Sequence, residues 1–173
     1  MNPTEANNDT LPGDLSGLLR VAIADMEGLD RDRYQPNSGD WHEPSAGAKY
    51  CRVCLAGGVM AGTMQVPHGA SVTPAEATGR DHDTHNRLQA LDDLRSGDVW
   101  AAAFSLTGGY HRNGDMAAFA ASPEAEKADA LICLHPELLN RVRARRRFIG
   151  WREWDELRPI FAELADALEQ AGL

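Results

Sequence analysis

Two cysteines three residues apart, Cys51 and Cys54, have the spacing most suggestive of chemistry in this 173-residue chain. Zinc takes four ligands from Cys and His, and a CxxC motif supplies two of them when a second pair lies elsewhere. The remaining candidate ligands are His42, His82, His85, Cys133 and His135. His82 with His85, or Cys133 with His135, would have to complete such a metal site, since the sequence holds no second CxxC.

Two other interpretations of Cys51 and Cys54 stay open at this point. Free cysteine is among the most buried residue types, so both thiols can serve as small interior side chains, which is the interpretation that the sequence favours. A nucleophilic or redox thiol is the third interpretation, because a helix N-terminus can lower a thiol pKa. We do not expect the strand followed by a helix that frames a thioredoxin-like CxxC.

Carboxylates and histidines elsewhere in the sequence are expected on exposed surfaces. Asp92 and Asp93, like the acids between residues 153 and 156, alternate with a Leu or Trp stripe, which predicts solvated helix faces. The run from Asp81 to His85 is interpreted as a loop and helix cap. Nucleotide-binding glycine motifs, GxSxG and HExxH are all missing from the sequence. We therefore predict no catalytic residue and no cofactor, and the balance favours a protein that is not an enzyme.

Arginine is concentrated in one band near the C-terminus, formed by Arg141, Arg143, Arg145, Arg146 and Arg147. Its functional interpretation is a grip on phosphate or carboxylate groups, including those of nucleic acid. The alternative is a basic helix end that faces an acidic body. Because 26 acidic and 17 basic residues give a net charge of −9, the sequence favours the alternative, and nucleic acid is not the expected partner.

Composition limits the class of protein. Hydrophobic residues make up 43% of the chain and charged residues 25%, as in globular domains. The sequence has no apolar run long enough to cross a membrane and no basic, then apolar, leader at its start. Three cysteines do not form a disulfide framework. A cytoplasmic protein without membrane contact is the resulting expectation.

The elements that position these residues are predicted from hydrophobic spacing. The expected fold is a single, mostly α-helical domain of six to eight helices over residues 12–173, after a disordered lead at 1–11. Residues 30–49 are expected to form a polar connection. The glycines of 50–64 are expected to let another helix approach closely, and Asp83 or Thr84 to cap the helix that follows residue 82. The predicted helices are 15–28, 50–64, 84–97, 99–106, 116–121, 124–133, 136–142 and 151–168, with a helical turn at 74–77. A strand is the alternative for 50–64, because a short apolar run fits either element, but its length and its Ala, Met and Leu content favour a helix.

Tryptophan marks two further features. Trp41 interrupts the polar connection and is expected to fold back onto the body. Trp41 and Trp100, with Asp92 and Asp93, are candidate partner-binding residues. The last helix carries an apolar seam of nearly heptad spacing, which predicts closure over the core or pairing between two chains in a homodimer. Pro159 within it predicts a kink or two abutting helices.

Two segments together resemble small uncharacterised proteins of bacteriophages and prophages. These are Trp41-His-Glu-Pro44 and the core Cys51-x-Val-Cys54-Leu-Ala-Gly-Gly-Val-Met-Ala61. The likeness extends to the Leu-rich helix at 88–94 and an amphipathic helix at the end, and covers about residues 14–104 plus the tail.

This resemblance implies a context and not a mechanism. Small acidic phage proteins often act by binding a host protein, and some inhibit defence systems such as CRISPR. Acidic surfaces can also imitate DNA and occupy basic grooves. The resemblance therefore implies a non-enzymatic accessory protein whose partner is a host protein.

Overall fold

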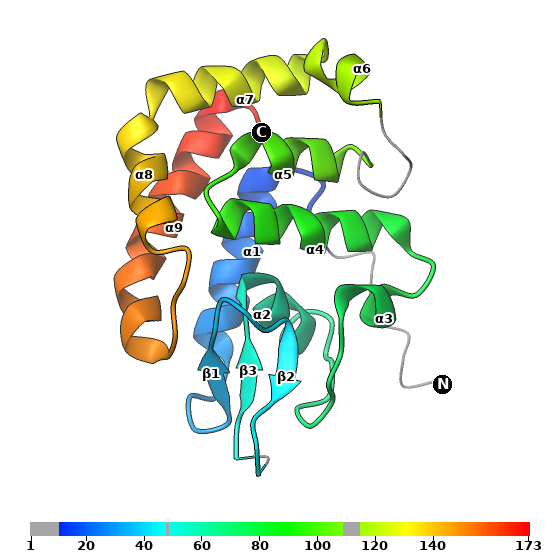
Figure 1. The fold of residues 1–173 in the computed structure, drawn as a ribbon, viewed down its shortest axis with the longest axis vertical. Helices are drawn as coiled ribbons and strands as arrows, with labels where there is room; N and C mark the ends of the chain where they lie inside the picture. The colour runs from blue at the N-terminus through cyan, green and yellow to red at the C-terminus, as the bar shows by residue number, and fades with distance from the viewer. Residues whose placement is uncertain (1–10, 48, 109–114) are drawn as a thin grey trace.

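The structure is a computed structural model that describes residues 11–47, 49–108 and 115–173 (Figure 1). The fold is mostly α-helical, as predicted, with a small three-stranded sheet at one end. The helices are α1 (Leu15–Gly28), α2 (Leu55–Ala61), α3 (Pro74–Thr78), α4 (His82–Arg95), α5 (Val99–Leu106), α6 (Met116–Ala120), α7 (Pro123–Leu134), α8 (Pro136–Ala144) and α9 (Trp151–Ala171). The strands are β1 (Tyr34–Pro36), β2 (His42–Pro44) and β3 (Cys51–Val53).

Only one residue of the lead predicted at 1–11 can be compared with the structure. Residues 1–10 of the lead predicted at 1–11 lie outside the described residues. Leu11 is described and belongs to the core, where only 5% of its surface is exposed. The ordered body therefore includes Leu11, one residue earlier than predicted.

Helices α1 and α9 lie side by side through the body of the molecule (Figure 1). Asp14 caps α1 by accepting a hydrogen bond from the Gly17 amide, and the leucines of α1 then fall on one buried stripe. The predicted seam of α9 supplies the other half of this contact, with Trp154 and Phe161 fully buried. The seam is thus buried within the chain, which is the predicted closure over the core.

Two details of the predicted helices change. Helix α9 runs unbroken through Pro159, which lies on its exposed side, so the alternative of two abutting helices is wrong. Helix α4 begins at His82 because the Asp81 side chain accepts a hydrogen bond from the Thr84 amide. The predicted caps Asp83 and Thr84 instead lie inside its first turn.

The segment from 30 to 64 departs furthest from the prediction. Strands β1 and β2 lie within the polar connection predicted at 30–49, where they flank β3 in the order β1-β3-β2. Strand β1 is parallel to β3 and β2 is antiparallel to it. The predicted helix at 50–64 is wrong in its first part, since residues 51–53 form β3 and α2 begins only at Leu55.

Small residues in α2 allow the close contacts that the glycines predict. A methyl group added at Gly58 would lie 3.3 Å from the Met26 side chain of α1. One added at Gly57 would lie 1.5 Å from the backbone oxygen of Trp41. Gly57 is therefore required where the loop after β1 crosses α2, and Gly58 where α1 packs.

No helix in the described part of the chain is both long and apolar enough to span a lipid bilayer.

Candidate functional site

The two cysteines of the CxxC motif lie at the junction of β3 and α2. Cys51 is on β3 and points inward, while Cys54 is the N-cap of α2, where its Sγ accepts a hydrogen bond from the Gly57 amide at 3.4 Å. The two cysteines therefore do not lie in one helix, as the helix predicted at 50–64 would require, and the expectation that a strand followed by a helix is missing is wrong. What distinguishes them from redox thiols is burial, with 0% and 2% of their surfaces exposed.

Burial also keeps both thiols protonated at neutral pH. Loss of hydration raises the pKa of Cys51 to about 11, and nearby Glu43 adds to the rise. The same cause raises the pKa of Cys54 to about 12, against the opposing hydrogen bond from the Gly57 amide. A thiol with such a pKa is a poor nucleophile, because that role needs the thiolate.

The histidine nearest to Cys51 is His42, from strand β2. Its Nδ1 lies 3.4 Å from the Cys51 sulfur and 2.7 Å from the Ala70 carbonyl oxygen, to which it donates a hydrogen bond. Burial lowers the pKa of His42, so the ring is neutral at pH 7. His42 and Cys51 thus form a buried neutral pair that ties the sheet to the 70–72 loop.

His82 and His85, the histidine pair predicted to complete a metal site, lie elsewhere, in the first turn of α4. His82 is exposed, and the Nδ1 of His85 lies 3.5 Å from the Thr78 hydroxyl. Across residues 11–47, 49–108 and 115–173, no three His, Cys, Asp or Glu side chains are grouped closely enough to hold a metal ion. His82 and His85 therefore do not complete a ligand set with Cys51 and Cys54.

The arginine band lies at the end of α8 and in the loop before α9. Arg141 contacts Glu163 at 2.8 Å, and Arg145 contacts Glu156 at 2.6 Å. Both glutamates are on α9, which lies alongside α8 (Figure 1). The structure thus has the arrangement of the alternative interpretation, in which a basic helix end faces acidic neighbours.

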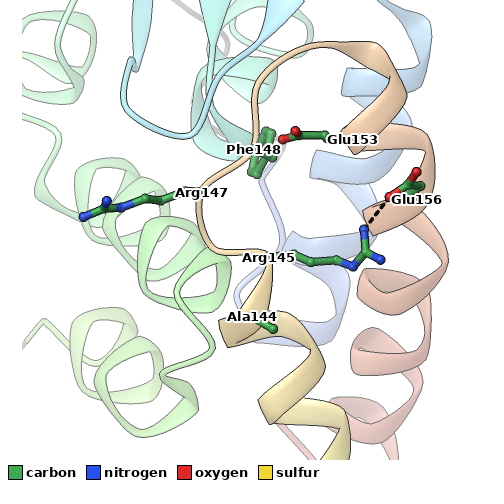
Figure 2. Close-up of a pocket in the computed structure, with 6 residues that line it drawn as sticks. All are labelled: Ala144, Arg145, Arg147, Phe148, Glu153 and Glu156. Atoms are coloured by element: carbon green, nitrogen blue, oxygen red, sulfur yellow. Dashed lines mark hydrogen bonds and ion pairs between the residues drawn. The ribbon is translucent and has the colours of Figure 1, made fainter.

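The loop of the band borders an open pocket of about 420 Å³ against the first turns of α9 (Figure 2). In Figure 2 the Arg145 side chain reaches toward Glu156, and Arg147 points away from both glutamates. Glu153 uses one carboxylate oxygen to accept a hydrogen bond from the Ile149 amide. The pocket therefore mixes paired charges of both signs and does not present a row of free arginines to an anion.

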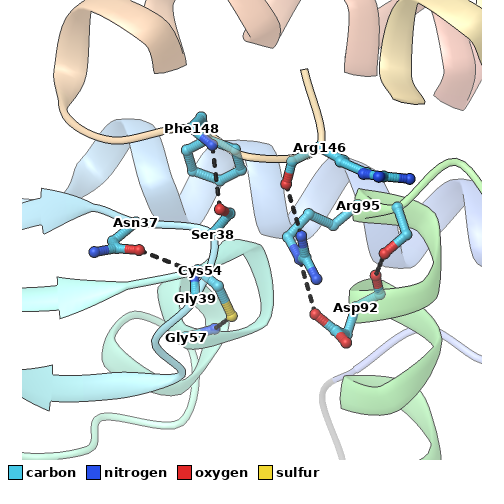
Figure 3. A network of polar contacts seen from close by, with 10 residues as sticks. Asn37, Ser38, Gly39, Cys54, Gly57, Asp92, Arg95, Arg146 and Phe148 are labelled. Atoms are coloured by element: carbon cyan, nitrogen blue, oxygen red, sulfur yellow. Dashed lines mark hydrogen bonds and ion pairs between the residues drawn. The ribbon is translucent and has the colours of Figure 1, made fainter. Parts of the chain in front are cut away.

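The remaining two arginines of the band make local contacts, Arg143 through its side chain and Arg146 through its backbone. The Arg143 side chain runs past Gly97 and contacts Asn140. The backbone oxygen of Arg146 accepts a hydrogen bond from Arg95 at 2.8 Å, and Arg95 also contacts Asp92 at 2.8 Å (Figure 3). Arg95 thus fastens the loop before α9 to the end of α4.

The predicted solvated face at Asp92 and Asp93 is corrected by the structure. Asp92 is the partner of Arg95, and its side chain is 24% exposed. Asp93 is half-buried against α5 and accepts a hydrogen bond from the buried Ser105 hydroxyl at 2.7 Å. Burial, together with the neighbouring Asp92 and Asp98 carboxylates, raises the pKa of Asp93 to about 6. Neither aspartate stands free on the surface for a partner, because contacts to α5 and Arg95 occupy them.

The two candidate tryptophans are half-buried and lie in different surroundings. Trp41 packs against the core beside α2, as its predicted return to the body requires. Trp100 on α5 stacks with Phe104 and meets Phe119 of α6 edge-on, with ring centroids 5.8 and 4.8 Å apart. These rings hold α6 against α5, so much of the apolar surface of Trp100 is already covered.

Sequence reasoning missed the acids on the outer side of α7. Glu126 and Asp129 are exposed there, and Glu137 is exposed in the first turn of α8. In the described part of the chain, no ion pair reaches these three carboxylates. The local charge of the sequence could have indicated these acids, since residues 115–140 hold five acids and one base.

No family model, curated protein or solved structure matches this chain.

Proposed function

We propose that the protein is a non-enzymatic, phage-type accessory protein that binds a basic surface of a host protein in the cytoplasm. One observation carries the proposal: among the described residues no ion pair reaches Glu126 and Asp129 on the outer side of α7 or Glu137 at the start of α8, while the acids of α9 are mostly paired. Asp155, Glu156 and Glu163 of α9, for example, contact Arg31, Arg145 and Arg141.

Surface charge is therefore unevenly distributed between the α9 side and the α7 side of the molecule. Paired charges on the α9 side largely cancel at a distance, whereas the α7 acids add to one another. A positively charged protein surface is therefore drawn toward α7, and screening by salt weakens the attraction. Proteins that bind nucleic acid carry such basic surfaces, which supports a host defence nuclease as partner and imitation of DNA as the mode of action.

The test is capture of host proteins on immobilised protein, with two single charge reversals as a matched pair. Asp129→Lys and Asp32→Lys each change the net charge by two. Both aspartates are exposed, and neither has an ion-pair partner among the described residues. We expect the wild type to retain specific basic proteins at low salt and to release them as salt rises.

The comparison of the two variants decides the proposal. Asp129→Lys should lose the captured proteins and Asp32→Lys should keep most of them. Equal loss from both variants would mean that only total charge matters, and retention by both would remove α7 from the binding surface.

A further inference from the structure

We propose that the outer side of α7 is a built contact surface, with an apolar centre and an acidic rim, for a basic amphipathic helix of the partner protein. The centre is formed by Ala130, Cys133 and Leu134, and the rim by Glu126 and Asp129. This inference rests on the proposed function and names the element that α7 recognises.

The apolar centre is exposed to an unusual degree. Leu134 is 75% exposed, the highest fraction of any large apolar side chain in the described residues. Cys133 beside it is exposed, in contrast to Cys51 and Cys54. A large aliphatic side chain left in water at the end of a helix loses a favourable burial that a partner can restore.

Helical spacing places the centre and rim together. Glu126, Ala130 and Leu134 are four residues apart and so lie along one line of α7, and Asp129 and Cys133 form the neighbouring line. The opposite side of α7 carries Ala125, Ala128 and Leu131, all buried in the core. The outer side is therefore not needed for the fold.

The shape and charge of this side favour a basic helix as the occupant. The small side chain of Ala130, between larger neighbours, allows another helix to approach closely. Lys127, the one basic residue of α7, reaches the Gly172 backbone oxygen at 3.3 Å on the flank of the helix. A helix with leucines on one stripe and lysines beside it would cover Leu134 and meet Glu126 and Asp129, the arrangement of apolar core and polar rim found in protein interfaces.

The test uses two synthetic helical peptides of equal positive charge as probes. One carries a leucine stripe flanked by lysines, and in the other the leucines are replaced by glutamine. Binding is measured by fluorescence anisotropy for the wild type, Leu134→Ser, Asp129→Lys and Asp32→Lys. Protection of Cys133 from alkylation by a maleimide locates the bound peptide.

The expected results separate the apolar centre from the acidic rim. Leu134→Ser should weaken binding of the leucine peptide about tenfold and leave binding of the glutamine peptide unchanged. Asp129→Lys should weaken both peptides about tenfold, and Asp32→Lys should change neither appreciably. The bound leucine peptide should slow alkylation of Cys133. Because every changed side chain is exposed, the variants should melt with the wild type.

Contrary results would overturn one proposal or both. If the two peptides bind equally and Leu134→Ser has no effect while Asp129→Lys does, the apolar centre is wrong and the acidic surface of the proposed function stands. If Cys133 stays unprotected under saturating leucine peptide, the apolar centre is likewise wrong. If Asp129→Lys and Asp32→Lys behave alike, α7 is not the contact surface and both proposals fail.

Discussion

Replacing Asp93 with asparagine tests how the α4–α5 contact carries a half-buried charge. The Asp93 carboxylate is desolvated and lies near Asp92 and Asp98, which together raise its pKa to about 6. Asparagine keeps an oxygen that can accept the hydrogen bond from Ser105 but removes the charge. We therefore expect Asp93→Asn to be more stable than the wild type at pH 8.

The size of the effect follows from the linkage between pKa and stability. A pKa raised in the folded state means that protonation favours folding, so stability is gained as pH falls through 6 and is lost as it rises. The rise from 3.8 to about 6 corresponds to about 3 kcal/mol between the fully protonated and the ionised carboxyl. Partial exposure of the side chain reduces this to about 1 to 2 kcal/mol.

The assay is urea unfolding of the wild type and Asp93→Asn at pH 5 and pH 8. Ionisation of Asp93 should lower the free energy of unfolding of the wild type by about 1 kcal/mol between pH 5 and pH 8, and the variant should lack this change. Other groups titrate in both proteins and cancel in the difference, and Asp32→Asn serves as an exposed control. A variant that is destabilised at pH 8, or that shows the same pH dependence as the wild type, would refute the reasoning.

Four further outcomes follow from the packing and the ion pairs. Gly57→Ala should lower the free energy of unfolding by about 3 kcal/mol, because the added methyl meets the Trp41 backbone. Gly58→Ala should change the free energy of unfolding by no more than about 1 kcal/mol, and thermal unfolding of the two variants tests the difference. Arg95→Ala should cost about 2 kcal/mol in urea unfolding, since Arg95 is largely buried and holds two contacts. Arg141→Ala should cost less than about 1 kcal/mol, as its ion pair is exposed. In the native protein Cys133 alone should react with a maleimide, counted by intact mass, and the other two thiols should react only after unfolding.

Hydrophobic spacing predicted most of the helices, because each long helix buries a single stripe. Asp14 and Asp98 cap α1 and α5 at the starts of two predicted helices, and the α9 seam lies in the core. Spacing failed for the sheet, where each strand has three residues, too few to show alternation. The apolar run that begins at Val53 continues from the end of the strand through α2, so hydropathy alone does not show where the strand ends and the helix begins.

The candidate site was harder to predict because side-chain pairing depends on contacts far apart in the sequence. Arg141 is a free cation in the sequence and a partner of Glu163 in the fold. Asp93 sits in a polar run, yet its helix turns it toward Ser105. The pairing of Cys51 with His42 needed the β2–β3 register, which places the two strands side by side. Local charge was the one signal that indicated α7, and it is visible in residues 115–140.

The arginine band and the α7 surface are two consequences of one charge distribution. With a net charge of −9, an even spread of acids would attract any basic molecule weakly from every side. Ion pairs from α8 and the 31–33 turn instead neutralise much of the charge on the α9 side, whereas Glu126 and Asp129 of α7 have no ion-pair partner among the described residues. Breaking the Arg141–Glu163 ion pair should then reduce the preference of a basic peptide for α7 over α9 more than it reduces the affinity of the peptide for the protein. Arg141→Gln frees Glu163 on α9 and gives a basic peptide a second place to bind, which a rise in binding stoichiometry on titration would reveal and an unchanged stoichiometry would contradict.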